Sequence, residues 1–173
     1  MSSFKLKVLL TGAAAVGKTS LVQRFIKNRF QANYKLTVGV DILTKDVEFV
    51  PGQMATLSIW DIGGQQRFEF IRSTFYKGAA GTLLVFDLTR EQTYNEIRKW
   101  LTEIRQFAGD IPFVLIGNKA DLIEDVGIVI DRDEARSFAE NEGSIYIETS
   151  AKTGINVDDA FTELTRRIID SRT

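Results

Sequence analysis

The sequence lacks the two side chains that carry much nucleophilic and metal chemistry, because none of its 173 residues is cysteine or histidine. The absence of cysteine excludes disulfides, zinc–thiolate sites and thiol nucleophiles, and it fits a reducing compartment. Without histidine, any catalysis must proceed without imidazole as a base, an acid or a metal ligand. The common cysteine-based and histidine-based enzyme classes are therefore excluded.

Long apolar runs and an excess of one charge are also missing. No stretch approaches the roughly 20 consecutive apolar residues that a membrane-spanning helix needs. The formal net charge is −1, so no bulk field attracts nucleic acid or an anionic membrane. The N-terminus has no signal-peptide pattern, and residues 169–173 offer neither a cysteine for prenylation nor a polybasic cluster. We expect a cytoplasmic monomer that binds no nucleic acid, with membrane association only through partners or a further tail.

Apolar runs of strand length alternate with longer segments of helical period, without a repeat or a linker. Strands are predicted at Phe4–Leu10, Asp41–Val50, Met54–Trp60, Thr82–Asp87, Phe113–Gly117 and Ile145–Glu148, and helices at Lys18–Lys27, Glu91–Phe107, Asp131–Asn141 and Val157–Ile169. The turn pair Pro51-Gly52 makes the second and third strands antiparallel neighbours. The pattern predicts one three-layer α/β domain over residues 1–173, with a six-stranded, mostly parallel sheet, one antiparallel strand and about five helices.

The first motif follows the first predicted strand and opens the first predicted helix. Residues Gly12–Thr19 read GAAAVGKT and match the pattern GxxxxGK[ST] of a phosphate-binding loop. Backbone N–H groups of such a loop surround phosphates, and the helix N-terminus adds a favourable dipole. Lys18 should reach the β- and γ-phosphates, and the Thr19 hydroxyl should ligate Mg²⁺. The plain alternative is a small-residue turn that only leads a strand into a helix.

Two further motifs follow the last two predicted strands. In Asn118–Asp121, the carboxylate of Asp121 can accept hydrogen bonds from N1–H and N2–H₂ of guanine, a donor pair that adenine lacks. The apolar stem of Lys119 is suited to lie over the base. In Glu148–Lys152, a backbone N–H, expected from Ala151, can donate to guanine O6. Alone, either segment could be a polar or helix-capping loop.

A glycine-containing motif, Asp61–Gln65, follows the strand predicted to end at Trp60. Asp61 is placed to hold Mg²⁺ through water, since Mg²⁺ keeps several waters in proteins. Gly64 has no side chain to keep its N–H from a γ-phosphate. Gln65 can orient an attacking water. A simple glycine turn after a strand is the alternative.

With these motifs in order, the sequence resembles the Ras superfamily of small GTPases, most closely the Rab-like branch, with some Arf-like character in the second switch. The Rab-like cues are Val38–Asp41, Ile59–Asp61, Arg67-Phe68 and Tyr76–Ala79. The resemblance implies a P-loop GTPase fold that binds GTP or GDP with Mg²⁺. It also implies two switch segments, about Gln31–Asp41 and Gly64–Lys77, that become ordered with the γ-phosphate.

The resemblance adds roles that the residues alone do not show. It implies that Phe30 packs against the base and that Thr37 ligates Mg²⁺. Motifs and resemblance together assign the nucleotide to Ala13, Ala14, Ala15, Val16, Gly17, Lys18, Thr19, Ser20, Phe30, Tyr34, Thr37, Gly64, Asn118, Lys119, Asp121, Ser150, Ala151 and Lys152. They assign the metal to Thr19, Thr37 and Asp61, and catalysis to Gln65, Lys18 and Thr37.

The sequence departs from the family pattern around the same motifs. Ile62-Gly63 stands where Thr-Ala is usual, and the paired glycines are more like the Arf branch. Gln66 replaces a Glu that helps exchange factors eject nucleotide in the family. Ala14 occupies a position that is often Gly in Ras proteins and commonly Ser in Rabs, and its methyl could crowd an incoming arginine finger.

Three functions fit these residues to different degrees. The first is a switch enzyme that slowly hydrolyses GTP, with charge neutralisation by Lys18, Mg²⁺ and loop amides in place of a strong base. The second is a GTP-loaded scaffold with negligible turnover, which Ala14 and Ile62 would allow and the intact Gln65 disfavours. The third is a P-loop ATPase, which Asp121 argues against.

Partners are expected to include effectors that recognise the GTP state, an exchange factor and a GTPase-activating protein. Ile42, Trp60 and Phe75 fall where Rab-like proteins display an apolar effector patch between the switches. Strand alternation can place Ile42 and Trp60 on one face of the hairpin. The alternative is that all three are core residues, since large apolar side chains are mostly buried for packing alone.

Overall fold

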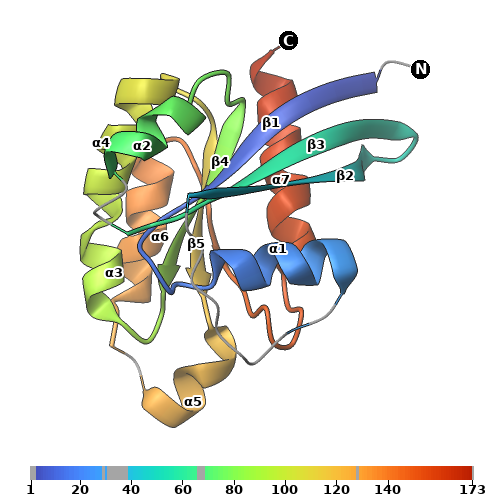
Figure 1. Cartoon of the computed structure of the whole chain (residues 1–173). Helices are drawn as coiled ribbons and strands as arrows, with labels where there is room; N and C mark the ends of the chain where they lie inside the picture. Colours follow the sequence, from blue (N-terminus) through green and yellow to red (C-terminus); the bar gives the residue numbers. More distant parts are fainter. Residues whose placement is uncertain (1–2, 29, 31–38, 66–68, 128, 173) are drawn as a thin grey trace.

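A computed structural model describes residues 3–28, 30, 39–65, 69–127 and 129–172. A six-stranded sheet with the strand order β2-β3-β1-β4-β5-β6 forms the centre of the molecule. Only the pairing of β2 with β3 is antiparallel, and the other strands of the sheet run parallel. Helices cover both faces (Figure 1). The predicted α/β architecture is therefore confirmed.

The element bounds follow the sequence pattern closely. The strands are β1 (Ser3–Thr11), β2 (Val40–Val50), β3 (Gln53–Ile62), β4 (Gly81–Asp87), β5 (Phe113–Asn118) and β6 (Tyr146–Glu148), and the helices are α1 (Lys18–Lys27), α2 (Glu69–Arg72), α3 (Glu91–Asn95), α4 (Ile97–Ala108), α5 (Ile123–Val126), α6 (Arg132–Asn141) and α7 (Val157–Ser171). Short 3₁₀ turns lie at Ser73–Phe75 and Ala120–Leu122.

Alternation along the central strands explains why they are continuous apolar runs. In β4, Leu83 and Val85 pack in the core beneath α1 and α7, whereas Leu84 and Phe86 pack beneath α3, α4 and α6. Every residue of β4 and β5 is buried. A strand covered by helices on both faces needs apolar side chains on both sides, so no polar alternation remains in the sequence.

Helix ends account for the differences from the predicted bounds. The single helix expected over Glu91–Phe107 is divided into α3 and α4 by a turn at Glu96, where ψ is −4°. A break of one residue leaves the apolar period almost intact, so periodicity could not reveal it. The start of α6 is fixed by Asp131, whose carboxylate accepts a hydrogen bond from the Glu134 amide at 3.0 Å.

One predicted boundary was wrong in a way that affects the site. The strand expected to end at Trp60 continues to Ile62. Asp61 therefore lies within β3, paired in register with Leu10 of β1 and Asp41 of β2, and not in the following turn. Backbone pairing on both sides fixes this carboxylate more rigidly than a loop would.

Among the described residues, no helix is both long enough and apolar enough to cross a bilayer.

Candidate nucleotide-binding site

The loop between β1 and α1 contains three residues with positive φ: Gly12 at 134°, Ala15 at 65° and Gly17 at 101°. A Cβ on Gly12 would lie 2.1 Å from the carbonyl oxygen of Val85, and one on Gly17 would lie 2.2 Å from Nδ2 of Asn118. These glycines let the loop approach β4 and the end of β5. The loop thus lies at the carboxyl edge of the sheet, where α/β proteins bind ligands.

Lys18 points back into this loop. Its Nζ donates to the carbonyl oxygens of Gly12 at 2.8 Å and Ala13 at 2.7 Å, and the residue is only 6% exposed. Burial lowers the pKa of the Lys18 ammonium to about 8, and attraction to Asp61 offsets part of that effect. An anionic group placed here would compensate the desolvated ammonium, as phosphate does in P-loop proteins.

Thr19, in the first turn of α1, meets Asp61 from β3. The Thr19 hydroxyl donates to Oδ2 of Asp61 at 2.6 Å, and Asp61 is buried. A hydroxyl and a carboxylate are the hard oxygen donors that Mg²⁺ prefers, and Mg²⁺ commonly takes only one or two protein ligands beside substrate phosphates. The described part of the chain has no cluster of three or more His, Asp or Glu residues that could hold a metal. The hydroxyl and carboxylate of Thr19 and Asp61 have the donor chemistry that a nucleotide-associated Mg²⁺ would need.

The turn after β3 lies directly against the phosphate-binding loop. The Gly63 N–H donates to the carbonyl oxygen of Gly39 at 2.7 Å. A Cβ on Gly64 would lie 2.2 Å from the carbonyl oxygen of Gly12 and 2.7 Å from the Ala14 nitrogen. Only glycine permits this approach, which places the next residue, Gln65, beside the phosphate-binding loop.

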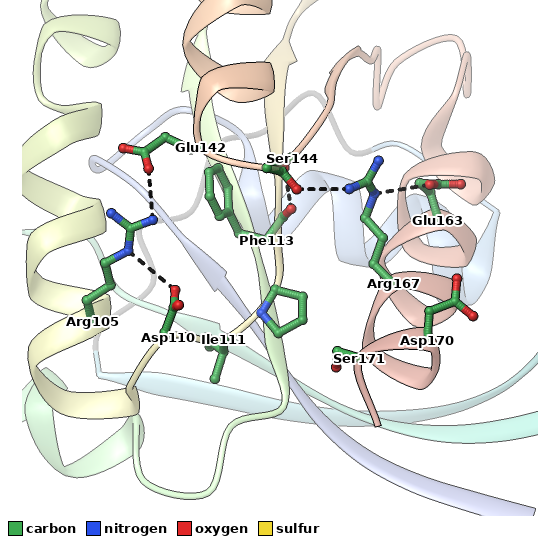
Figure 2. A pocket seen from close by; sticks show the side chains of 12 residues that line it. Arg105, Asp110, Ile111, Phe113, Glu142, Ser144, Glu163, Arg167, Asp170 and Ser171 are labelled. Carbon is green, nitrogen blue, oxygen red and sulfur yellow. Dashed lines mark hydrogen bonds and ion pairs between the residues drawn. The ribbon is translucent and has the colours of Figure 1, made fainter. Parts of the chain in front are cut away.

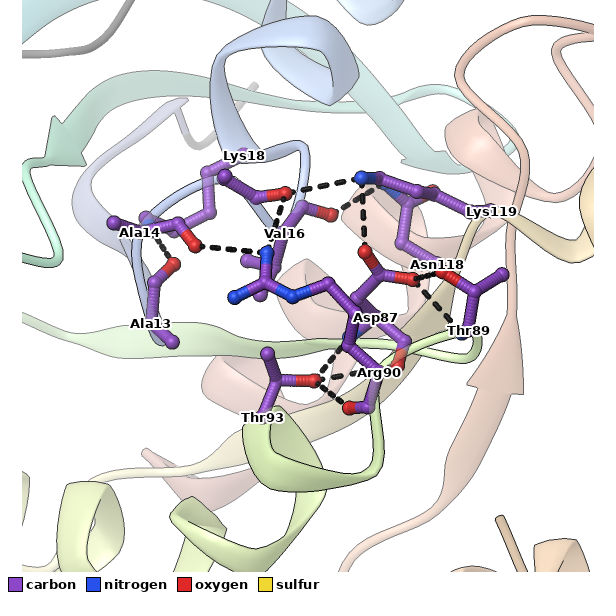
Figure 3. Close-up of polar contacts among 11 residues, drawn as sticks. Ala13, Ala14, Val16, Lys18, Asp87, Thr89, Arg90, Thr93, Asn118 and Lys119 are labelled. Carbon is purple, nitrogen blue, oxygen red and sulfur yellow. Dashed lines mark hydrogen bonds and ion pairs between the residues drawn. The ribbon is translucent and has the colours of Figure 1, made fainter. Parts of the chain in front are cut away.

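Side chains from β5 and from the loop after β6 connect the remaining motifs. Nδ2 of Asn118 donates to the carbonyl oxygen of Val16 at 2.9 Å, and its Oδ1 accepts from the Thr149 hydroxyl at 2.9 Å. The Ser150 hydroxyl donates to Oδ1 of Asp121 at 2.7 Å. These contacts, the first of which appears in Figure 3, bring three segments far apart in sequence to one edge.

Lys119 connects the same region to β4. It has a left-handed backbone conformation, with φ 69°, and its Nζ donates to the carbonyl oxygen of Ala15 at 3.0 Å. The same Nζ lies 2.8 Å from Oδ2 of Asp87 (Figure 3). The Lys119 stem therefore spans the gap between the phosphate-binding loop and the Asp121 loop, where a base would lie.

Two arginines that the sequence did not single out also support the site. Nε of Arg24 in α1 donates to the carbonyl oxygen of Ala151 at 2.7 Å, and Nη2 donates to that of Lys152 at 2.5 Å. These bonds orient the loop whose amide is expected to meet guanine O6. Nη1 of Arg90 approaches the carbonyl oxygen of Ala14 at 3.4 Å (Figure 3). Lone arginines carry no motif, so no sequence signal distinguished them.

Glu148, the last residue of β6, directly precedes the loop that contains Ser150, Ala151 and Lys152. Arg132 donates two hydrogen bonds to its carboxylate, and the Tyr146 hydroxyl donates a third at 2.6 Å. Partial burial acts to raise the pKa of Glu148, but the hydrogen bonds from Arg132 and Tyr146 outweigh it, so the pKa is lowered. The carboxylate therefore stays ionised and paired at neutral pH.

The remaining predicted residues are distributed as follows. Ser20 is half-buried in the first turn of α1. Phe30 is 38% exposed, and its predicted packing against the base stays a prediction. Tyr34 and Thr37 lie outside the described residues, so their predicted contacts with nucleotide and metal stay predictions.

A pocket lies at the opposite edge of the sheet from the nucleotide motifs, where β5 begins. Arg105, Glu142, Phe113, Ser144 and Arg167 are among its lining residues (Figure 2). Its charged groups pair with one another: Arg105 lies 3.0 Å from Glu142, and Arg167 lies 3.1 Å from Glu163. This pocket is separate from the nucleotide motifs and contains none of their residues.

The fold and the site define a P-loop nucleotide-binding protein with motifs for guanine. The Ras family model matches residues 7–170. The chain is 41% identical to the Ras-related protein RABA1i of Arabidopsis thaliana over 163 residues, which are 94% of this chain and 73% of that protein. It is 39% identical to human Rab-22A, over 97% of this chain and 86% of the relative, and 39% identical to Rab-2B of Dictyostelium discoideum, over 94% and 80%.

The chain therefore belongs to the Ras family of small GTPases and is Rab-like. This membership makes it a GTP hydrolase of the small-GTPase type. The resemblance to a Rab-like member of the Ras superfamily, inferred from the sequence motifs, is confirmed.

Proposed function

We propose that the protein is a molecular switch that binds GTP or GDP together with Mg²⁺ and slowly converts GTP and water into GDP and phosphate. One observation carries this proposal. Gly64 packs directly on the phosphate-binding loop, so Gln65 is held beside the place where Lys18 and Thr19 would meet the phosphates. This packing supports a single site for nucleotide binding, metal binding and water orientation.

Guanine specificity is assigned to Asp121. Its Oδ1 already accepts from Ser150, which orients the carboxylate, and the neighbouring loop is held by Arg24 through backbone carbonyls. The carboxylate would accept from N1–H and N2–H₂ of guanine, and the Ala151 amide would donate to O6. Adenine would leave the carboxylate without donors, which argues against the ATPase alternative.

Phosphate binding is assigned to the loop Gly12–Thr19. Lys18 would exchange its two carbonyl partners for β- and γ-phosphate oxygens, and loop amides would supply further hydrogen bonds. Thr19 and Asp61 would hold Mg²⁺, with Thr37 as a further ligand. When bound, Mg²⁺ supplies neutralisation of the charge that develops on the phosphate oxygens.

Water orientation is assigned to Gln65. We expect Gln65→Leu to keep GTP and GDP affinity within a few-fold and to slow single-turnover phosphate release by at least about 10-fold, because only the orienting amide is lost. Phosphate release from preloaded protein, measured with and without Mg²⁺, checks this. Gln106→Leu in α4 is the matched control, since Gln106 is exposed and belongs to none of the nucleotide motifs.

The same experiment separates the switch from a GTP-loaded scaffold. If wild-type protein keeps its GTP and releases no measurable phosphate over many hours, the scaffold is supported. Ala14 and Ile62, which replace the residues usual in the family, would then account for the lost turnover. Measurable, Mg²⁺-dependent release that Gln65→Leu slows would support the switch. Equal release by wild type and Gln65→Leu would contradict the role of Gln65.

Effector recognition is assigned to an apolar surface between the switches. Ile42 and Trp60 are direct cross-strand partners in the β2–β3 hairpin, and the Trp60 and Phe75 rings lie 6.2 Å apart. Ile42 is exposed, while Trp60 and Phe75 are half-buried. Phe70 in α2, which the sequence did not single out, is 92% exposed. The three adjacent apolar side chains, together with an exposed Phe70 five residues before Phe75 in the chain, favour a protein-binding patch over pure core packing.

We expect Phe70→Ala to weaken GTP-dependent partner binding by roughly 2 kcal/mol, because exposed aromatic residues dominate protein interfaces. The free energy of unfolding of the Phe70→Ala variant should stay within about 0.5 kcal/mol of wild type, since the ring is almost fully exposed. The measurement is the amount of protein that the GTP-loaded chain retains and the GDP-loaded chain does not. The melting temperature of each variant is measured in parallel. Phe107→Ala, on α4, is the control for loss of an exposed ring. Undiminished GTP-dependent retention by Phe70→Ala would contradict the patch.

A further inference from the structure

A buried polar network connects the turn after β3 to helix α4. Arg72, the last residue of α2, is 4% exposed, and Glu103 of α4 is 8% exposed. The guanidinium binds the carboxylate through two parallel hydrogen bonds, Nη2 to Oε1 at 2.8 Å and Nε to Oε2 at 3.1 Å. This two-point geometry fixes the plane of the guanidinium more firmly than a single contact would.

Two aromatic side chains complete the network. The guanidinium carbon of Arg72 lies 4.4 Å from the centroid of the Trp100 ring, also in α4. The Tyr76 hydroxyl donates to Oε2 of Glu103. Burial, followed by this hydrogen bond, raises the pKa of Tyr76, so the phenol remains a donor at neutral pH. Glu103 is thus held from two sides, and Arg72 is held by Glu103 and Trp100.

A further donor of Arg72 reaches the turn that carries Gln65. Nη1 donates to the backbone carbonyl oxygen of Gln65 at 2.7 Å. At the other end of the same short turn, the Gly63 N–H is bonded to Gly39, and Gly64 packs on the phosphate-binding loop. Gln65 is therefore held in two ways. The contacts of Gly63 and Gly64 fix the residues that precede it, and Arg72, which is bound to Glu103 of α4, donates a hydrogen bond to its carbonyl oxygen.

A buried ion pair is weak evidence for a stabilising role. Removing two charges from water costs several kcal/mol per ion, and well-packed apolar residues often serve stability as well or better. The arrangement found here does something that apolar residues cannot do, because it delivers an N–H donor in a fixed direction to one backbone carbonyl. The contacts with Glu103 and Trp100 orient the guanidinium, and its Nη1 donates to the carbonyl oxygen of Gln65.

We propose that Arg72 is a positioning residue for GTP hydrolysis: its bidentate pairing with Glu103 holds the backbone of Gln65 so that the Gln65 amide can orient the attacking water. The inference rests on the proposed role of Gln65. Arg72 itself touches neither water nor nucleotide in this role. A displacement of about 1 Å in a catalytic group can cost on the order of 100-fold in rate, which is the scale on which such an anchor acts.

Arg72→Lys tests the proposal directly. Lysine keeps the charge and an ion pair with Glu103, but one ammonium lacks the planar fork needed to bond Glu103 twice and Gln65 at once. Single-turnover hydrolysis should slow by about 10-fold or more, while GTP affinity stays within about 3-fold. In a Gln65→Leu background, where the carbonyl remains but the amide is gone, Arg72→Lys should change the rate by less than 2-fold.

Arg105→Lys is the matched control. Arg105 lies on the same helix as Glu103 and pairs with Glu142, but at the opposite edge of the sheet (Figure 2). It should leave hydrolysis at the wild-type rate. If Arg72→Lys does not bind GTP, the double variant Arg72→Met/Glu103→Met replaces the pair with apolar groups, and the same slowing and the same dependence on Gln65 are expected.

The outcomes are distinguishable. A wild-type rate for Arg72→Lys, or equal slowing by Arg72→Lys in the wild-type and Gln65→Leu backgrounds, would overturn the positioning role while leaving the proposed function intact. A wild-type rate for Gln65→Leu alone would instead remove the proposed role of Gln65, and the positioning role with it. Slowing by Arg72→Lys that disappears in the Gln65→Leu background supports the proposal.

Discussion

Substitution of Asp121 by asparagine is expected to weaken GTP binding by on the order of 100-fold or more and to favour xanthosine nucleotides. The asparagine oxygen can still accept from N1–H, but its amide would face the N2–H₂ donor of guanine. Xanthine has a carbonyl at C2, to which that amide can donate. Equilibrium titration with fluorescent GTP and XTP analogues measures both affinities in one protein.

The Asp121 variant should fold normally, because an asparagine oxygen can still accept from the Ser150 hydroxyl, which lies 2.7 Å from Oδ1 in the wild type. Asp125→Asn is the matched control: the same substitution at an exposed position in α5, four residues further on, should leave both affinities unchanged. Undiminished GTP affinity in Asp121→Asn would remove this residue from the base-binding site.

Replacement of Lys18 by methionine is expected to weaken GTP binding by about 2 to 5 kcal/mol, or at least about 30-fold, because the variant lacks the buried charge that we propose pairs with the phosphates. The stability of the nucleotide-free protein should not fall by more than about 1 kcal/mol. Burial lowers the pKa of Lys18 to about 8, so the ammonium is held at a desolvation cost that methionine, of similar length, does not have.

Nucleotide titration and denaturant unfolding of the nucleotide-free protein separate the two effects of this substitution. Lys27→Met, at the exposed end of the same helix, is the control and should change neither quantity. A loss of stability as large as the loss of affinity would mean that Lys18 serves mainly to hold the carbonyls of Gly12 and Ala13, with which it bonds in the structure.

The residues of the proposed effector surface were predicted only in part from the sequence pattern. Strand alternation allowed Ile42 and Trp60 to share one face of the hairpin, and they do so as direct cross-strand partners. The turn at Pro51-Gly52 alone would not have given this pairing, because the register shifts by one residue between Glu48 and Val50. It could not show that Phe70 would be exposed, since a four-residue helix gives too little periodicity to distinguish a buried face. The extent to which Trp60 and Phe75 are covered depends on helix placement, which is a tertiary property.

The sequence by itself determined the class of protein and the order of its elements. The loop Gly12–Thr19 and the Asn118–Asp121 motif are local patterns whose chemistry is tied to fixed spacing, and each follows a strand that its apolar run identifies. The apolar strand segments, which alternate with helical segments, also indicated a sheet that helices cover on both faces. That residues 1–173 form a single domain remains a prediction from the sequence. The roles of Tyr34 and Thr37 also remain predictions.

Only the tertiary structure decided which isolated side chains support the site. The bonds from Arg72 to Glu103, from Arg24 to Ala151 and from Asn118 to Val16 join residues 31, 127 and 102 positions apart. In the sequence, each arginine looks like any other charge on a helix surface. Their contacts arise because strand order β3-β1-β4-β5-β6 brings the carboxyl ends of distant strands to one edge, and that order is set by packing between elements and not by any local pattern.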